Sequence, residues 1–248
     1  GFHCKQSPFV EDLKDRGFAV VDRTASEAAM ASLAETWGRW ASDQETPKDG
    51  RLQLSSVDFS ETVNELLPML RQLITKEVED TLESYFVSYT RIFNFHIYRN
   101  TKALNVSGAD SYGATGHWHT DGSTSESIKL FFMLSDINAN NGPMEILSRT
   151  DTRKVVQSNK FFFPDKKGHT VRYIGDECKI TSLQGKRGSS FYALTNDVLH
   201  RATVPNEGEF RDLIVFYITS SSIKRPIEQQ LKEAKYSEIY GLKRLGMD

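Results

Sequence analysis

Three residues in the second half of this chain have side chains and spacings that suit metal chemistry. His119 and Asp121 are separated by a single residue, and His200 follows much later. Two imidazoles and one carboxylate can occupy one face of an octahedral divalent metal ion and leave three coordination positions open. A His-x-Asp pair is short and easily arises by chance, so the prediction of a metal site requires that the fold places His200 next to the pair.

The spacing of the pair favours an extended strand, on which residues two apart point to the same face. His119 and Asp121 then face inward together, and a turn containing Asn196 and Asp197 can return His200 opposite them. His117 has the same spacing from His119, so a register in which His117 also faces inward stays open. The remaining histidines are expected to be ordinary core or surface residues: His3, His96 and His169. Of these, His96 lies on a predicted strand that can line a pocket.

Arg211 stands at the head of a strand-like run, FRDLIVFYITS. The period of two places it on one face with Leu213, Val215 and Tyr217. An arginine on an inward apolar face needs an anionic partner, because an unpaired buried charge is costly. A guanidinium binds a carboxylate through two parallel hydrogen bonds. Arg211 is therefore a candidate binder of a carboxylate on a small molecule. The alternative is an arginine at a strand end, paired with Glu209 or Asp212.

Hydrophobic periodicity indicates the elements that must position these residues. Residues 88–220 contain short aromatic and β-branched runs separated by glycine, asparagine and proline, which is typical of an antiparallel barrel or sandwich. Residues 1–87 are expected to be mainly helical, apart from a short strand at 17–22. Residues 221–248 form a further expected helical segment, whose apolar residues contact the body: Ile227, Leu231, Tyr236 and Ile239.

Two helices are expected in the N-terminal part. The first has Thr24 as its N-cap, with Glu27 completing a capping box. The second runs from about Ser60 to Phe86, and Pro68 either kinks it or separates its first turn. No linker divides the sequence, so residues 1–248 are expected to form a single α+β domain.

Composition narrows the class of protein. The formal net charge of −2 argues against a nucleic-acid partner, and no apolar run is long enough to span a membrane. Cys4 and Cys178 are too few and too isolated for a disulfide framework. These observations predict a soluble, intracellular protein, expected in the cytoplasm.

The segments that carry the candidate residues resemble a known family, the phytanoyl-CoA dioxygenase-type Fe(II)/2-oxoglutarate-dependent dioxygenases. The resemblance spans roughly residues 9–220, and its matching segments are GFAVVD (17–22), GHWHTDG (116–122), NNGPMEIL (140–147), GSSFYALTNDVLHRAT (188–203) and FRDLIVFYIT (210–219). It implies a double-stranded β-helix core, a jelly-roll or cupin-like fold, with flanking N-terminal helices and a C-terminal helix.

The resemblance also implies roles for individual residues. Iron is held by His119, Asp121 and His200, and Arg211 binds the far carboxylate of 2-oxoglutarate. The 1-carboxylate and 2-oxo oxygens of this cosubstrate chelate the iron, and dioxygen is the second cosubstrate. Three further residues are expected to border 2-oxoglutarate: Phe131, Tyr98 and Ala202. Ala202 occupies a position at which relatives often carry a serine. Whether Lys129 points into the barrel or outward stays open.

The implied reaction is oxidation, most simply hydroxylation, of a C–H bond of a small metabolite or natural-product intermediate, with release of succinate and carbon dioxide. A peptidyl hydroxylase with the same chemistry, and a cupin-like metal-binding protein without oxygenase activity, remain alternatives. The loops 100–116 and 158–169 are expected to determine the substrate. The turn at Asn141-Gly142-Pro143 is interpreted as structural and away from the metal.

Overall fold

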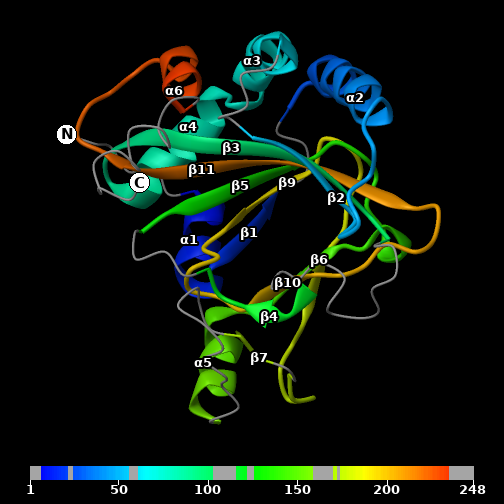
Figure 1. The fold of residues 1–248 in the computed structure, drawn as a ribbon. Coiled ribbons are helices and arrows are strands. Elements are labelled where there is room, and N and C mark those ends of the chain that lie inside the picture. Colours follow the sequence, from blue (N-terminus) through cyan, green and yellow to red (C-terminus); the bar gives the residue numbers. More distant parts are fainter. Residues whose placement is uncertain are drawn as a thin grey trace, which may run out of the picture.

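Two antiparallel sheets face each other and enclose the centre of the protein (Figure 1). The computed structural model describes residues 7–21, 25–55, 61–102, 116–121, 126–158, 170–171 and 174–234. The six-stranded sheet has the order β1 (Phe18–Val21), β9 (Ser190–Ala193), β5 (Ile128–Met133), β11 (Phe210–Ser221), β3 (Tyr89–Thr101) and β2 (Arg51–Ser55). The five-stranded sheet has the order β7 (Thr170–Val171), β4 (Trp118–His119), β10 (His200–Ala202), β6 (Met144–Ile146) and β8 (Thr181–Leu183).

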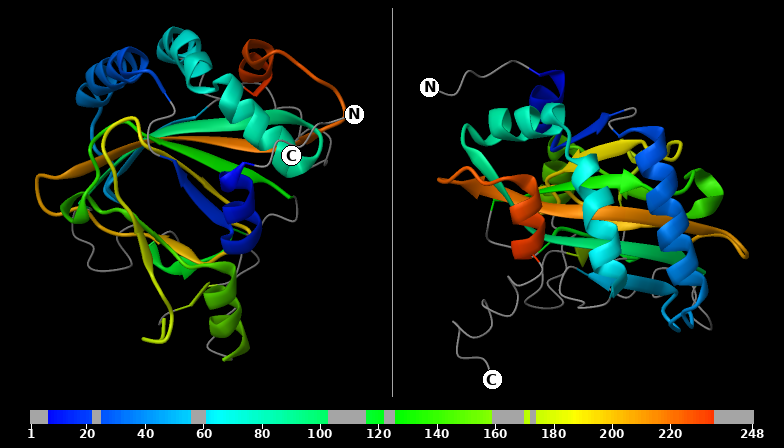
Figure 2. Two further views of the ribbon diagram at one scale, coloured as in Figure 1. Left: turned by 180° about the vertical axis from the view of Figure 1, so that it is seen from behind. Right: turned by 90° about the horizontal axis from the view of Figure 1, so that it is seen from above.

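Helices cover the outer face of the larger sheet, as Figures 1 and 2 show from three directions. These helices are α2 (Glu27–Ser42), α3 (Glu61–Leu73), α4 (Lys76–Phe86) and α6 (Ile227–Ala234). The helix α1 (Pro8–Arg16) packs beside β1, and α5 (Arg149–Gln157) lies beneath the smaller sheet. The predicted α+β jelly roll with flanking helices is confirmed.

The long strand β11 shows how the sequence pattern builds two apolar layers. Ile214, Phe216 and Ile218 are buried in the cluster beneath the helices. Leu213 and Val215 are buried in a second cluster, between the sheets. Because successive side chains alternate between the faces of a strand, one strand supplies both layers. The predicted inward face of β11, which begins at Arg211, therefore looks into the space between the sheets.

Two predictions about the helices were wrong in detail. The cap of α2 is Ser26, whose hydroxyl accepts a hydrogen bond from the backbone of Ala29 at 3.2 Å, and Thr24 lies outside the described residues. The segment 60–86 is not one helix divided at Pro68, since that residue lies inside α3. The break falls at Thr75, which caps α4 by accepting from the backbone of Val78.

The C-terminal prediction is partly tested. In α6, Ile227 and Leu231 are buried against the body, as expected. Tyr236 and Ile239 lie outside the described residues, as do most of the two loops expected to determine the substrate. Within the described ranges, no helix has the length and apolar character needed to cross a membrane.

Candidate metal centre and adjoining pocket

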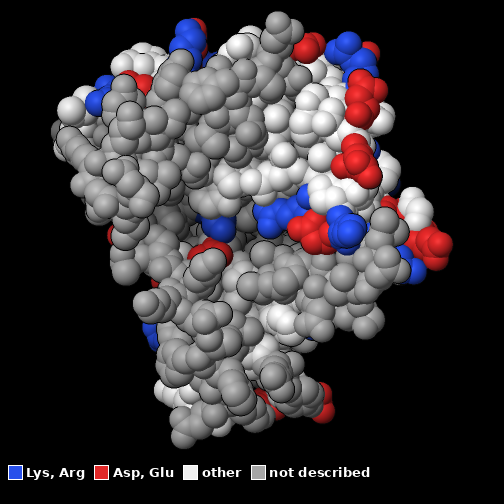
Figure 3. Space-filling model, in the orientation of Figure 1, with Lys and Arg blue, Asp and Glu red and all other residues white. Residues whose placement is uncertain are grey.

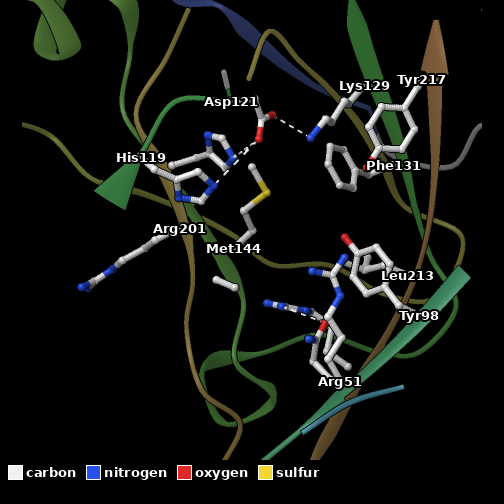
Figure 4. A pocket seen from close by; sticks show the side chains of 14 residues that line it. Arg51, Tyr98, His119, Asp121, Lys129, Phe131, Met144, Arg201, Leu213 and Tyr217 are labelled. Carbon is white, nitrogen blue, oxygen red and sulfur yellow. Dashed lines mark hydrogen bonds and ion pairs between the residues drawn. The ribbon is translucent and has the colours of Figure 1, made fainter. Parts of the chain in front are cut away.

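The strand pairing of the smaller sheet brings the three candidate ligands together. His200 of β10 pairs directly with His119 of β4. Asp121 lies just past the end of β4, where its backbone N–H donates to the carbonyl of Thr195 at 2.9 Å. Its Oδ1 atom lies 3.9 Å from Nε2 of His119 and 4.0 Å from Nε2 of His200. One ligand atom from each residue lies within 4.8 Å of the others, so the three can share one ion (Figure 4).

Backbone carbonyls orient both imidazoles. Nδ1 of His119 lies 2.8 Å from the carbonyl of His117, and Nδ1 of His200 lies 3.1 Å from the carbonyl of Val198. A carbonyl can only accept, so each Nδ1 carries the proton and donates it. The lone pair of each ring is then on Nε2, which faces Asp121. This arrangement fixes the tautomer that a metal ligand needs.

Burial and neighbouring charges hold the three groups in their metal-binding protonation states. Burial, together with the nearby His119, lowers the pKa of His200 to about 3, and burial also lowers the pKa of His119. Burial alone raises the pKa of Asp121, but the charges of Lys129 and His200 outweigh it and bring that pKa down to about 2. At neutral pH the site therefore has two neutral imidazoles and one carboxylate, a donor set that fits a divalent transition metal.

The same pKa shifts predict how the stability of the metal-free protein depends on pH. In the unfolded chain His200 takes up a proton near its ordinary pKa of 6.5, but in the folded protein it does so only near 3. Between these values the unfolded state binds more protons, so stability falls as the pH decreases below 6.5, by roughly 1 kcal/mol per pH unit for this histidine. His119 acts in the same direction.

Denaturant unfolding of metal-free protein at intervals from pH 7.5 to 4.5 measures this dependence. The variant His200→Gln should show a shallower slope. A wild-type slope that is flat below pH 6.5 would show that the histidines protonate freely in the folded state.

One pocket is lined by the three ligands and by Arg211. Arg211 belongs to the far side of this pocket, because it bonds Asn100, the strand partner of Arg51, and Figure 4 shows Arg51 across the pocket from His119 and Asp121. Arg211 is 2% exposed, and its Nη2 donates to Oδ1 of Asn100 at 3.2 Å. Its acidic neighbours have other partners: Asp212 binds Arg99 through both carboxylate oxygens at 2.8 Å. Glu209 accepts instead from Asn141. Basic and acidic side chains also gather on the molecular surface at the level between the two sheets (Figure 3).

The Asn-Gly-Pro turn has a part in the site that its sequence does not indicate. Nη1 of Arg211 donates to the carbonyl of Gly142. Gly142 has a φ of 70°, and a Cβ atom there would lie 2.5 Å from the carbonyl oxygen of Thr203. Only glycine combines this backbone conformation with so close a contact. The turn was interpreted as structural, and the structure shows that it also supplies an acceptor that orients Arg211.

The other predicted pocket residues are brought to the same space. Tyr98, Phe131 and Ala202 all line the pocket. The ring of Phe131 stacks on Phe191 with centroids 4.5 Å apart, which holds it rigidly. Burial raises the pKa of Tyr98, so its phenol stays protonated and can donate a hydrogen bond.

Two open questions about orientation have structural answers. Lys129 points inward and lies 2.6 Å from Oδ2 of Asp121. His117 and His96 are not among the pocket-lining residues. The His96 ring packs on Tyr217, with centroids 5.1 Å apart. The register with His119 and Asp121 as the inward pair is therefore the one that the structure adopts.

Sequence reasoning missed several pocket residues, and Arg51 is the clearest case. It lies on β2, which was not predicted as a strand, and its guanidinium is 4.9 Å from the centroid of the Tyr98 ring. Polar and apolar residues alternate in RLQLS, which is the pattern of a strand, but five residues are too few for a firm prediction. The other missed residues line the pocket from β3, β6 and β10: Asn100, Met144 and Arg201.

Solved structures show which known proteins share this fold. EctD from S. alaskensis, solved with 2-oxoglutarate and 5-hydroxyectoine, matches 89% of this chain and 79% of its own at 13% identity and a TM-score of 0.58. The epimerase SnoN, in complex with Fe3+, alpha-ketoglutarate and nogalamycin RO, matches 86% and 82% at 13% identity and a TM-score of 0.57. The chain has the jelly-roll fold of the iron- and 2-oxoglutarate-dependent oxygenases.

This oxygenase fold hosts different reactions among its members. The non-heme alpha-ketoglutarate-dependent carbocyclase SnoK, from nogalamycin biosynthesis, matches 90% of this chain and 88% of its own at 11% identity and a TM-score of 0.60. No protein-family model and no curated protein sequence matches the chain. Since a fold does not determine a reaction, the activity must be argued from the residues of the site.

Proposed function

We propose that this protein is an Fe(II)- and 2-oxoglutarate-dependent oxygenase that oxidises a C–H bond of a small molecule. The observation that carries the proposal is one pocket with a His-Asp-His group at one end and a buried arginine at the other. A metal-binding protein without oxygenase activity would not need an arginine in the pocket of the metal ligands. The cosubstrate complexes of EctD and SnoN, which have the same fold, support the proposal.

His119, Asp121 and His200 would hold the iron. Their Nε2 atoms and Oδ1 converge, and the two backbone carbonyls keep the rings from rotating. When bound, iron supplies the activation of dioxygen and the oxidative decarboxylation of 2-oxoglutarate to succinate and carbon dioxide. The single carboxylate leaves part of the metal charge for the dianionic cosubstrate to balance.

The residues at the other end suit a dicarboxylate. Arg211 presents a planar guanidinium held by Asn100 and Gly142, so little freedom is lost when a carboxylate binds. The Tyr98 phenol lines the same end and can donate to that carboxylate, while Ala202 leaves room without adding a hydroxyl. Phe131, Met144 and Leu213 line the pocket between its ends and exclude water from the bound molecule.

Hydroxylation of a small metabolite or natural-product intermediate is the reaction that we propose for this site. The small molecules named with two neighbours of the same fold, 5-hydroxyectoine with EctD and nogalamycin RO with SnoN, support a small-molecule substrate. Most of the two loops that the sequence predicts to determine the substrate lie outside the described residues. The substrate itself is therefore to be found by measurement of succinate release across candidate compounds.

Anaerobic absorption spectroscopy tests the proposal without the substrate. Fe(II) is added to metal-free protein, followed by 2-oxoglutarate, and the visible spectrum is recorded after each addition. We expect a visible charge-transfer band that forms only when both are present. Folded protein with confirmed iron occupancy that shows no band would overturn the cosubstrate assignment and favour a metal-binding protein of another class.

A further inference from the structure

The two carboxylate oxygens of Asp121 face different partners. Oδ1 lies 3.9 Å and 4.0 Å from the Nε2 atoms of His119 and His200. Oδ2 lies 2.6 Å from Nζ of Lys129. Figure 4 shows this ion pair on the side of Asp121 that points away from the imidazoles. One oxygen is thus directed to the metal position and the other is held by a lysine.

Lys129 is itself held firmly by the larger sheet. On β5 it is flanked by Tyr217 of β11 and Ala193 of β9. Its ammonium lies 4.8 Å from the centroid of the Tyr217 ring, a cation–π contact, and its side chain is only 15% exposed. Ala193 is too small to obstruct it. A long side chain that is confined in this way can fix the orientation of its partner.

Asp121 is anchored at two points as a result. Its backbone N–H is bound to the carbonyl of Thr195, which follows β9, and its side chain is bound to Lys129. Both anchors come from the larger sheet or its continuation, whereas the two histidines belong to the smaller sheet. Rotation of the carboxylate about its own axis would break the ion pair with Lys129, so the structure opposes that rotation.

We propose that Lys129 is a positioning residue that holds Asp121 by Oδ2, so that Asp121 gives the metal one oxygen only. The inference rests on the proposed function. A triad that binds through one atom from each residue leaves three coordination positions open. The cosubstrate needs two of them and dioxygen needs the third. A carboxylate that also bound through Oδ2 would occupy the last position.

The test compares Lys129→Met, which keeps most of the length of the side chain and removes its charge, with Lys129→Arg, which keeps the charge. Each protein is loaded with Fe(II) and saturating 2-oxoglutarate without oxygen, and nitric oxide is titrated while its iron complex is followed by electron paramagnetic resonance. Nitric oxide is a neutral probe of the remaining coordination position, so the loss of a positive charge does not by itself change its attraction to the site.

We expect Lys129→Met to weaken nitric oxide binding by at least about tenfold, the usual scale for residues that orient metal ligands, and Lys129→Arg to restore it. Lys186→Met removes an exposed lysine that is paired with Asp136 at 2.9 Å, and it should bind like the wild type. Thermal unfolding establishes that each variant is folded.

The outcomes separate this inference from the proposed function. Wild-type protein that binds iron and 2-oxoglutarate, with a Lys129→Met variant that binds nitric oxide equally well, would overturn the role of Lys129 alone. Wild-type protein that binds iron but not 2-oxoglutarate would overturn the proposed function. In that case a crystal structure of the metal-loaded Lys129→Met variant still decides the inference, because it should show both oxygens of Asp121 at the metal.

Discussion

Replacing His200 by alanine should lower the affinity for Fe(II) by at least about 100-fold, since the site would lose one of its three ligands. His200 is 7% exposed, and its backbone pairs with both β4 and β6, so the strand should persist without the ring. The 2-oxoglutarate-dependent visible band should disappear with the metal. Titration with Fe(II) under anaerobic conditions measures the affinity directly.

His117→Ala is the matched control for this experiment. His117 is the only other histidine close in sequence to His119 and Asp121. Its backbone carbonyl, which accepts from His119, remains in place in the variant. Metal affinity should be unchanged in this variant. Loss of iron in His117→Ala, together with its retention in His200→Ala, would mean that the ligand set is wrong.

The second large effect is expected at Arg211. Arg211→Met should weaken 2-oxoglutarate binding by at least about 100-fold, because two charge-assisted hydrogen bonds to a carboxylate contribute roughly 3 kcal/mol or more together. Iron binding should stay within a few-fold of the wild type, because Arg211 is hydrogen-bonded to Asn100 and Gly142 and to none of the proposed metal ligands. Arg51, the strand partner of Asn100, lies across the pocket from His119 and Asp121 (Figure 4). Isothermal titration of the metal-loaded, oxygen-free protein separates the two affinities.

Arg211→Lys keeps the charge but loses the paired geometry, so its 2-oxoglutarate affinity should fall between those of Arg211→Met and the wild type. Arg99→Lys is the matched control, because Arg99 faces the opposite side of the same sheet and binds Asp212. It should leave 2-oxoglutarate affinity unchanged. Equal affinities in Arg211→Lys, Arg211→Met and the wild type would exclude Arg211 as the carboxylate binder.

The parts of the site that follow from short-range geometry could be predicted from the sequence. The strand period of two predicted that His119 and Asp121 face the same way, which holds although β4 ends at His119, and it also placed Arg211 at the head of an inward face. His200 could be placed only through the motif, because its partner lies in a strand far away in the chain. The pairing of β10 with β4 is a tertiary property that no local pattern contains.

The helix break that was placed wrongly and the orientation that stayed open both depend on contacts that the local sequence does not contain. The sequence suggested a break at Pro68, but that residue lies inside α3. The break lies at Thr75, whose side chain caps the start of α4. The orientation of Lys129 could not be derived, since a lysine on a strand is equally compatible with solvent and with a buried partner. Its direction depends on Asp121 and Tyr217, which other strands and loops bring to it.

The placement of the two ends of the pocket on different sheets has a consequence for selectivity. The histidines belong to the smaller sheet, and Arg211 belongs to the larger one. Packed sheets lie about 10 Å apart, a spacing set by the side chains between them and not by any loop. Under the proposed function, the distance between the two sheets therefore determines the length of cosubstrate that can reach both the metal and Arg211. A dicarboxylate with one methylene fewer or more than 2-oxoglutarate would span the wrong length, whatever covers the pocket from outside.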